Sequence, residues 1–230
     1  MEVRSIENVQ VNQVAVLPNK GIKELLGEYN AYKYIKRFFD IICSGLALIL
    51  LSPFFLIISI LIKLDSKGPV FFVHKRIGKN GKTIGIYKFR TMVSNAEELI
   101  KSFTPEQMKE FQENFKLEND PRITKIGKFL RKTSLDELPQ LINILKGDLA
   151  IVVPRPVIKD EVEKYGNNKE KFLSVTPGLT GYWAANGRST TTYPQRMTME
   201  LYYIDNISWK LDIKIILKTF ISVIKKEGAI

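Results

Sequence analysis

The chain has 230 residues, enough for one compact domain with an added anchoring segment. Its net charge is +11, and the stretch from Lys63 to Arg90 holds eight Lys and Arg residues against Asp65 alone. The single cysteine, Cys43, excludes an intrachain disulfide. With only one histidine, His74, the chain also lacks the several Cys and His ligands of a structural zinc site.

Residues 1–30 show no clear period, and we expect a loose N-terminal tail there. An uncharged apolar run then extends from Ile41 to Ile62. About 20 residues of helix cross a ~30 Å hydrocarbon core, so the run is a candidate membrane helix. Ser52-Pro53 lies at its middle, where proline removes a backbone donor and kinks a helix. We therefore predict a membrane segment over residues 31–66, formed by a helix, a break and a second helix.

Basic residues flank both ends of the run: Lys33, Lys36 and Arg37 before it, Lys63 and Lys67 after it. Positive charge marks the cytoplasmic side of a membrane segment, so the pattern favours a re-entrant helix that turns at Ser52-Pro53 and returns. The Ser52 hydroxyl could then satisfy a backbone carbonyl freed by the proline. An ordinary kinked span is the alternative, and the residues alone weigh the two about evenly.

A cytoplasmic domain is predicted over residues 67–208, and it opens with a small β-hairpin. The segment 69–77 (PVFFVHKRI) has strand composition, an Asn-Gly turn follows, and 82–90 (KTIGIYKFR) is its partner. Since strand side chains alternate, Lys88 and Arg90 are expected on one face.

The segment from Ser134 to Glu137 fits a capping box before an apolar helix. Pro139 must then lie near the first turn, and Gly147 closes the helix. This interpretation places Asp136 and Glu137 at a helix N-terminus, where free N–H groups favour anions.

Five basic residues lie at strand ends or turns instead of solvated helix faces: Lys88, Arg90, Arg131, Arg155 and Arg188. Arginine binds phosphate oxygens with two parallel bonds, and adjacent carboxylates such as Asp136-Glu137 bind Mg²⁺. A carboxylate can also act as a nucleophile and form an acyl phosphate. These features fit phosphoryl transfer, although the residues alone favour the simpler reading that Asp136-Glu137 only caps a helix.

Residues 209–230 are predicted to form an amphipathic C-terminal helix on a membrane surface, with Trp209 as an anchor. A core-facing helix is an equal alternative. The basic block beside the apolar run suits anionic lipid head groups or a phosphorylated substrate. A nucleic-acid partner is not expected, because no nucleic-acid motif accompanies the charge.

Several stretches resemble one family in the family's own order: KRFFDI at 36–41, GPVFF at 68–72, KFRTM at 88–92, LRKTSLDELPQLINILKGD at 130–148, PRP at 154–156, PGLTGYW at 177–183 and NGRS at 186–189. From residue 32 to residue 228 the chain is similar to the bacterial sugar transferases. These are monotopic polyprenyl-phosphate phosphoglycosyl transferases, also called undecaprenyl-phosphate sugar phosphotransferases.

The resemblance implies an α+β, mostly helical fold, with a re-entrant helix kinked at Ser52-Pro53 and both helix ends in the cytoplasm. It implies that Asp136 attacks the β-phosphate of a UDP-sugar and releases UMP. Undecaprenyl phosphate then accepts the phosphosugar in the first membrane step of exopolysaccharide, capsule or glycoconjugate synthesis. It also implies Mg²⁺ at Asp136 and Glu137.

The same resemblance assigns phosphate or nucleotide contacts to Arg131, Arg155 and Arg188, and a weaker one to Lys88. The implied location is the cytoplasmic face of the bacterial inner membrane, and an oligomer is possible. Two rival functions remain: a non-catalytic basic protein that docks on anionic lipid or a partner enzyme, and an enzyme that uses direct inverting attack on nucleotide sugars.

Two positions depart from the family pattern. Val152-Val153 stands where the family usually has Val-Gly, and a β-branched residue does not easily take the positive φ of a glycine. We therefore expect an altered PRP turn. Ala184-Ala185 replaces a frequent Gln-Val and removes a side-chain amide. The acidic pair and the arginines are intact, so activity is expected.

Overall fold

The structure, a computed structural model, describes residues 22–114, 117, 119–187 and 191–225. The helices are α1 (Ile22–Asp65), α2 (Ala96–Leu99), α3 (Pro105–Asn114), α4 (Lys125–Lys132), α5 (Gln140–Lys146), α6 (Lys159–Glu163), α7 (Lys169–Leu173), α8 (Tyr182–Asn186), α9 (Tyr193–Asp205) and α10 (Trp209–Ile224). The strands are β1 (Phe71–Ile77), β2 (Thr83–Phe89), β3 (Ala150–Val152) and β4 (Gly178–Thr180). The described fold is therefore mostly helical with a small β-hairpin, as predicted, and it contains a second two-stranded sheet that was not predicted.

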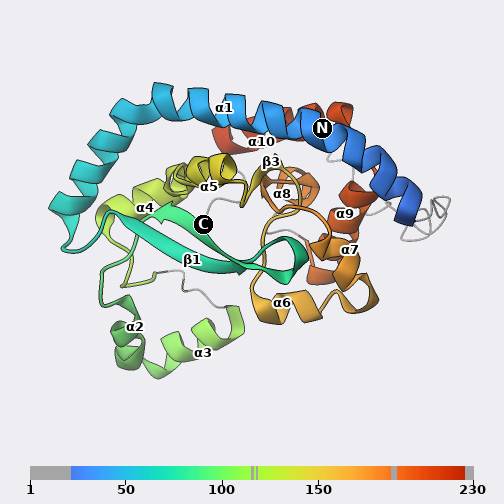
Figure 1. Cartoon of the computed structure of the whole chain (residues 1–230). Helices are drawn as coiled ribbons and strands as arrows, with labels where there is room; N and C mark the ends of the chain where they lie inside the picture. Colours follow the sequence, from blue (N-terminus) through green and yellow to red (C-terminus); the bar gives the residue numbers. More distant parts are fainter. Residues whose placement is uncertain (1–21, 115–116, 118, 188–190, 226–230) are drawn as a thin grey trace, which may run out of the picture.

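Helix α1 arches over the rest of the molecule and bends in its second half (Figure 1). It is continuous through Pro53, so the predicted break is a bend. Pro53 has no N–H to donate to the carbonyl of Ile49 one turn earlier. The hydroxyl of Ser52 donates to that same carbonyl at 2.8 Å, which confirms the role expected of Ser52. The helix also begins at Ile22, before the predicted boundary at residue 30, and residues 1–21 lie outside the described part.

Several polar side chains in the first half of α1 are bonded to the globular part, among them Tyr32, whose hydroxyl donates to Asp212 at 3.1 Å. The ammonium group of Lys36 donates to Asp212 of α10, and both side chains are buried. Arg37 donates to the carbonyl of Leu145 at the end of α5, at 2.8 Å. The carboxylate of Asp40 accepts from the backbone N–H of Ile151 at 3.1 Å.

The other end of α1 is bonded to the same globular part. The carboxylate of Asp65 accepts from the backbone N–H of Ile126 at 2.9 Å and so helps to cap α4. Between these ends, the inner face of α1 packs on the hairpin and α5 through Ala47, Leu48 and Leu51. Further along, Ile58 and Ile62 are buried in the core.

The outer face of α1 is apolar and exposed from Tyr34 to Leu64. Its exposed side chains include Phe38, Phe39, Ile42, Leu46, Ile49, Leu50, Phe54, Leu56, Ile57, Ile60, Leu61 and Leu64. By length and composition, α1 is the one described helix that could cross a membrane, and few of its side chains are buried. An apolar surface of this extent is typical of a membrane-facing segment.

Helix α10 combines the two alternatives predicted for it. Ile215 is buried in a core cluster with β3 and α9, so one face of α10 supports the fold. The opposite side exposes Trp209, Ile213, Leu217 and Phe220. Such a helix can pack on the domain and still present an apolar strip to a membrane surface.

The hairpin forms as predicted, with Phe72 opposite Lys88 and Val73 opposite Tyr87. A buried side chain of α5 pairs with it: Asn143 donates to the carbonyl of Gly85 at 2.6 Å and accepts from the N–H of Tyr87 at 2.9 Å. The Asn143 amide therefore fixes the position of β2 against α5. Strand β3 pairs in parallel with β4, a pairing that the sequence pattern did not indicate.

Candidate active site

The acidic pair lies on a 3₁₀ turn, η5 (Leu135–Glu137), between α4 and α5. Leu135 and Leu138 pack into the cluster that contains Ile62 of α1, so the turn rests against the second half of the long helix. Asp136 is only 8% exposed. A carboxyl group is rarely buried to this degree without a functional or structural partner.

The predicted capping box is wrong. Ser134 is left-handed (φ 56°, ψ 15°), and its side chain makes no capping hydrogen bond. An N-cap residue needs extended backbone angles to reach the N–H groups after it. Helix α5 instead begins at Gln140, with Pro139 at the N-cap position, and ends at Gly147 (φ 87°), as expected. The acidic pair therefore precedes the helix, and side chains supply the positive charge around it.

Two cations from separate elements contact the pair. Nζ of Lys88, on β2, lies 3.0 Å from Oε1 of Glu137 and 3.4 Å from Oδ2 of Asp136. Nη2 of Arg155, in the turn after β3, lies 2.6 Å from the same Glu137 oxygen. Glu137 thus pairs with two cations, while Asp136 has one longer contact.

The electrostatics of the two carboxyl groups differ accordingly. Burial raises the pKa of Asp136 above its ordinary value, although Lys88 and Arg131 oppose this and Glu137 adds to it. Burial would also raise the pKa of Glu137, but the charges of Arg155 and Lys88 outweigh it and hold that pKa well below its ordinary value. Environments that push the pKa values of two neighbouring acids apart are typical of active sites.

Arg131 approaches the pair from α4. Its Nε donates to the hydroxyl of Thr91 at 2.9 Å, which holds the guanidinium near the turn. Its charge is one of those that lower the pKa of Asp136. Of the five predicted basic residues, Lys88, Arg131 and Arg155 therefore surround the acidic pair.

Arg90 has a different position. It is buried at the C-terminal end of α1, where it donates to the carbonyl of Ser66 at 2.8 Å and to the hydroxyl of Ser94 at 3.2 Å. A guanidinium can satisfy the free carbonyls at a helix end, which explains this placement. The structure does not bring Arg90 to the acidic pair. Arg188 lies outside the described residues.

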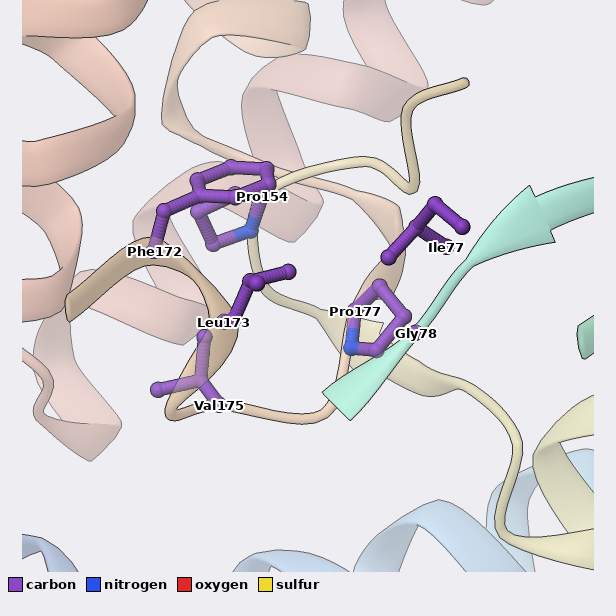
Figure 2. A pocket seen from close by; sticks show the side chains of 7 residues that line it. All are labelled: Ile77, Gly78, Pro154, Phe172, Leu173, Val175 and Pro177. Carbon is purple, nitrogen blue, oxygen red and sulfur yellow. The ribbon is translucent and has the colours of Figure 1, made fainter. Parts of the chain in front are cut away.

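Apolar side chains pack around Pro154, the residue before Arg155 (Figure 2). Pro154 lines a cavity of about 10 Å³ together with Ile77, Gly78, Phe172, Leu173, Val175 and Pro177. That volume holds one water molecule at most, so the cavity belongs to the packing and is not a substrate site.

The residues that depart from the family pattern are buried. In the described residues the only non-glycine positions with positive φ are Asn80 and Ser134, so Val153 fits without strain. Its N–H donates to the carbonyl of Thr180 at 2.9 Å and continues the β3–β4 pairing. Whether the PRP turn differs from that of the family stays a prediction. Ala184 and Ala185 are buried in α8, where small side chains suit the packing.

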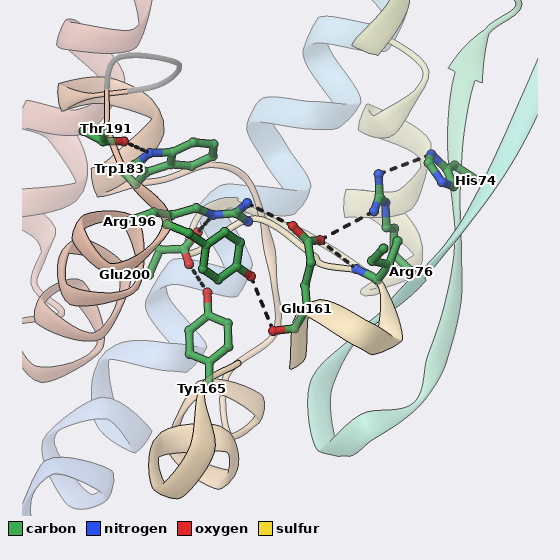
Figure 3. A network of polar contacts seen from close by, with 10 residues as sticks. His74, Arg76, Glu161, Tyr165, Trp183, Thr191, Arg196 and Glu200 are labelled. Carbon is green, nitrogen blue, oxygen red and sulfur yellow. Dashed lines mark hydrogen bonds and ion pairs between the residues drawn. The ribbon is translucent and has the colours of Figure 1, made fainter. Parts of the chain in front are cut away.

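A second polar network lies beside the site, between the hairpin, α6 and α9 (Figure 3). Arg196 pairs with Glu200 at 3.2 Å and with Glu161 at 3.4 Å, and Glu161 also reaches Arg76 of β1 at 3.9 Å. The buried Glu200 accepts from the hydroxyl of Tyr165. Alternating charges of this kind tie α6, α9 and β1 together beside Arg155.

Sequence reasoning missed this network, and part of it had a detectable signal. Arg196 and Glu200 have the i, i+4 spacing of a helical ion pair. Arg76 and His74 alternate along β1 on the face that carries Lys88, as the register shows. Burial, with the charges of Arg76 and Lys88, lowers the pKa of His74 to about 4, so this imidazole is neutral at pH 7.

The residues at the turn can be tested for a fit to Mg²⁺. No cluster of three or more Asp, Glu, His or Cys side chains lies in the described ranges. However, Mg²⁺ at phosphoryl-transfer sites is usually bound by one or two carboxylates and completed by water and substrate phosphates. Asp136 and Glu137 offer two carboxylates on one turn, which fits a site shared with a diphosphate.

The described part of the chain thus combines a buried acidic pair, three nearby cations and a long apolar helix bonded to the same domain. The family model for bacterial sugar transferases matches residues 31–226. The chain therefore belongs to the bacterial sugar transferase family.

Its relatives include the undecaprenyl-phosphate galactose phosphotransferase of Salmonella typhimurium, 42% identical over 200 residues, with 86% of this chain and 42% of the relative covered. The exopolysaccharide production protein ExoY of Sinorhizobium fredii is 43% identical over 197 residues, covering 84% of this chain and 87% of ExoY. The galactosyl transferase CpsE of Streptococcus agalactiae is 38% identical over 233 residues, covering 100% of this chain and 51% of CpsE. The chain thus spans about half the length or less of two of these relatives.

Proposed function

We propose that this chain transfers a phosphosugar from a UDP-sugar to undecaprenyl phosphate, with Asp136 as the nucleophile. One observation carries the proposal: Asp136 is buried on a turn that packs against α1, and Lys88 lies 3.4 Å from its Oδ2. The acceptor is a membrane lipid and the donor is water-soluble. A reactive carboxylate between an apolar helix and a group of phosphate-binding cations suits both substrates.

In the first step, a carboxylate oxygen of Asp136 attacks the β-phosphorus of the donor. The bond between that phosphorus and the bridging oxygen breaks, and UMP leaves with the oxygen. Lys88 and Arg155 would neutralise the charge that develops on the phosphate oxygens and on the departing UMP. The product is an acyl phosphate that joins Asp136 to the phosphosugar.

In the second step, a phosphate oxygen of undecaprenyl phosphate attacks the same phosphorus. The acyl phosphate bond breaks, and Asp136 leaves as a carboxylate. The product is undecaprenyl-diphosphate-sugar, and the nucleophile is regenerated without a net change in the protein. We place this step at the start of exopolysaccharide, capsule or glycoconjugate assembly.

Glu137 would hold Mg²⁺ together with Asp136 and the diphosphate. When bound, the ion would neutralise phosphate charge and orient the donor. Lys88 contacts both carboxylates, so it is placed to balance their charge before the donor arrives. Arg155 fixes the position of Glu137 from the other side.

The proposed topology is re-entrant, with the domain on the cytoplasmic face. Its support is that Lys36, before the apolar run of α1, and Asp65, after that run, are both bonded to one globular unit. Ends held on one unit could reach opposite sides of a bilayer only if part of that unit crossed it. The apolar outer face of α1 would enter the membrane from one side.

The reaction is tested by UMP release from a panel of UDP-sugars, with undecaprenyl phosphate and Mg²⁺. Release with one sugar should be abolished in Asp136→Asn and retained in Asp160→Asn, a matched change at an exposed aspartate. Retained release in Asp136→Asn would remove the nucleophile assignment. A phosphosugar trapped on the protein would exclude direct attack by the lipid on the donor.

The rival function, docking without catalysis, predicts no UMP release with any sugar and unchanged membrane binding in Asp136→Asn. It gives no reason for a buried acidic pair among three cations.

The topology is tested by cysteine labelling in intact cells, in a Cys43→Ser background. Cysteines at Tyr34 and Lys67 should both be protected from outside reagents, whereas labelling at Lys67 alone would show a full crossing.

A further inference from the structure

A shallow groove follows the last turns of α1, beside the start of the hairpin. It is lined by Ser59, Ile60, Lys63 and Leu64 of α1 and by Val70, and we call it the α1 groove. Its volume is about 260 Å³, below the ~300 Å³ at which small-molecule pockets usually begin. It therefore has room for a segment of a long ligand and not for a whole one.

The lining of the groove suits a hydrocarbon chain. The hydroxyl of Ser59 already donates to the carbonyl of Phe55 at 2.6 Å, so it offers little to a polar ligand. The ammonium group of Lys63 is the one charged group among the five lining residues. Ile60 is 51% exposed and Leu64 is 79% exposed, and both belong to the apolar outer face of α1. The groove is thus continuous with the apolar outer face of α1, which in the proposed topology enters the membrane.

The groove also leads to the acidic pair. The carbonyl of Val70 accepts from the N–H of Arg90 at 2.8 Å and extends the pairing of the hairpin beyond β1. Phe72 lies two residues further along and is 52% exposed. Because directly opposed residues of an antiparallel pair share a face, Phe72 lies beside Lys88, its partner in the register. Lys88 in turn contacts Asp136.

We infer that the α1 groove and Phe72 bind the isoprenoid chain of the acceptor lipid, so that its phosphate is delivered to Lys88 beside Asp136. This inference rests on the proposed function. An apolar groove and an exposed phenyl ring, leading from a membrane-facing helix to a phosphate-binding lysine, match an amphiphile with one phosphate at the end of an apolar chain. A nucleotide sugar has no apolar part for this lining.

The inference separates the two half-reactions. Exchange of labelled UMP into the UDP-sugar requires only the first step, because the acyl phosphate forms and reverses without acceptor. Transfer to lipid requires both steps. A change in the α1 groove should therefore affect transfer and leave exchange within about two-fold of wild type.

The test compares Ile60→Gln with Ile49→Gln, the same substitution at an exposed isoleucine of α1 outside the groove. Loss of an apolar contact of this size should raise the KM for undecaprenyl phosphate about ten-fold in Ile60→Gln. Ile49→Gln should keep the wild-type KM. With a two-unit prenyl phosphate, which has little chain to enter the groove, the two variants should differ much less than with undecaprenyl phosphate.

An unchanged KM in Ile60→Gln, or an equal rise in Ile49→Gln, would overturn the inference. So would a parallel loss of exchange, which would mean that the groove acts through the donor site or the fold.

Photocrosslinking provides a measurement that does not depend on catalysis. A diazirine-bearing prenyl phosphate should label the peptide that contains Ile60 and Leu64, and undecaprenyl phosphate should compete. Competition by phosphatidylglycerol to the same degree would assign the groove to ordinary membrane lipid and overturn the inference. Labelling without UMP exchange would support lipid binding in the α1 groove and contradict the proposed reaction of the donor. Exchange without labelling would support the reaction of the donor and overturn the inference about the groove.

Discussion

Nη2 of Arg155 lies 2.6 Å from Oε1 of Glu137, an ion pair that joins the turn after β3 to the turn before α5. Glu137→Gln removes the charge that holds both Arg155 and Lys88. We expect it to lower the rate of UMP release about 100-fold or more. Without Glu137 to hold them, Arg155 and Lys88 would no longer be positioned to bind the donor phosphates. Steady-state UMP release measures the effect.

The matched control is Glu163→Gln, which removes an exposed pair with Lys169. Exposed pairs contribute little, so its rate and stability should match wild type. Since folding lowers the pKa of Glu137, its ionised form favours the folded state. The stability difference between wild type and Glu137→Gln should be complete above the ordinary pKa of about 4.5 and shrink as the pH falls below it.

Lys88→Met should change the pH dependence of the reaction. Asp136, the proposed nucleophile, must be ionised to attack, and Lys88 is the strongest influence that lowers its raised pKa. Without that charge the pKa rises further, so the acid limb of the rate profile should move to higher pH. Lys82→Met, at the exposed tip of the hairpin, should leave the profile in place. A profile unaltered by Lys88→Met would show that another group controls the acid limb.

Asp136→Asn should stabilise the protein while it abolishes transfer. A carboxyl group whose pKa is raised by folding destabilises the folded state at pH values above that pKa. A neutral amide avoids this cost, so the melting temperature at pH 7 should rise by on the order of 2 °C. The gain should disappear at a pH low enough to protonate Asp136 in both states. A lower melting temperature at pH 7 would contradict the conclusion that burial of the ionised Asp136 carboxylate destabilises the fold.

Asn143→Ala should weaken the site from a distance. It leaves the carbonyl of Gly85 and the N–H of Tyr87 without their side-chain partner, at a cost of about 1–3 kcal/mol for each buried group. Lys88 follows Tyr87 on β2, so a shift of this strand would move Lys88 away from Asp136. The rate of UMP release should therefore also fall. Denaturant unfolding and UMP release measure the two effects. Asn167→Ala, at an exposed position, should change stability by less than about 0.5 kcal/mol.

Local patterns explain what could be predicted from the sequence. The alternation before and after the Asn-Gly turn predicted the hairpin, and the missing donor of Pro53 predicted the bond from Ser52. The adjacent Asp136-Glu137 and the arginine before them indicated a phosphate site, and the structure brings Lys88, Arg131 and Arg155 around the pair.

Other features depend on contacts that no local pattern carries. Strands β3 and β4 have three residues each and pair across a long separation, too short for alternation to reveal. The capping box failed because Ser134 adopts a left-handed backbone, which its composition did not signal. A guanidinium binds carbonyls as readily as phosphates, so the position of Arg90 at the end of α1 could not be distinguished from a substrate contact.

The attachment of α1 before and after its apolar run has a consequence for how the proposed lipid acceptor would reach the site. With Lys36 and Asp65 both bonded to the domain, the catalytic turn would stay at a fixed height above the bilayer. Undecaprenyl phosphate would then reach it by lateral diffusion in two dimensions, and the surface density of the lipid would set the encounter rate. Diluting the membrane with inert phospholipid should slow transfer even when the amounts of enzyme and acceptor in the tube stay the same.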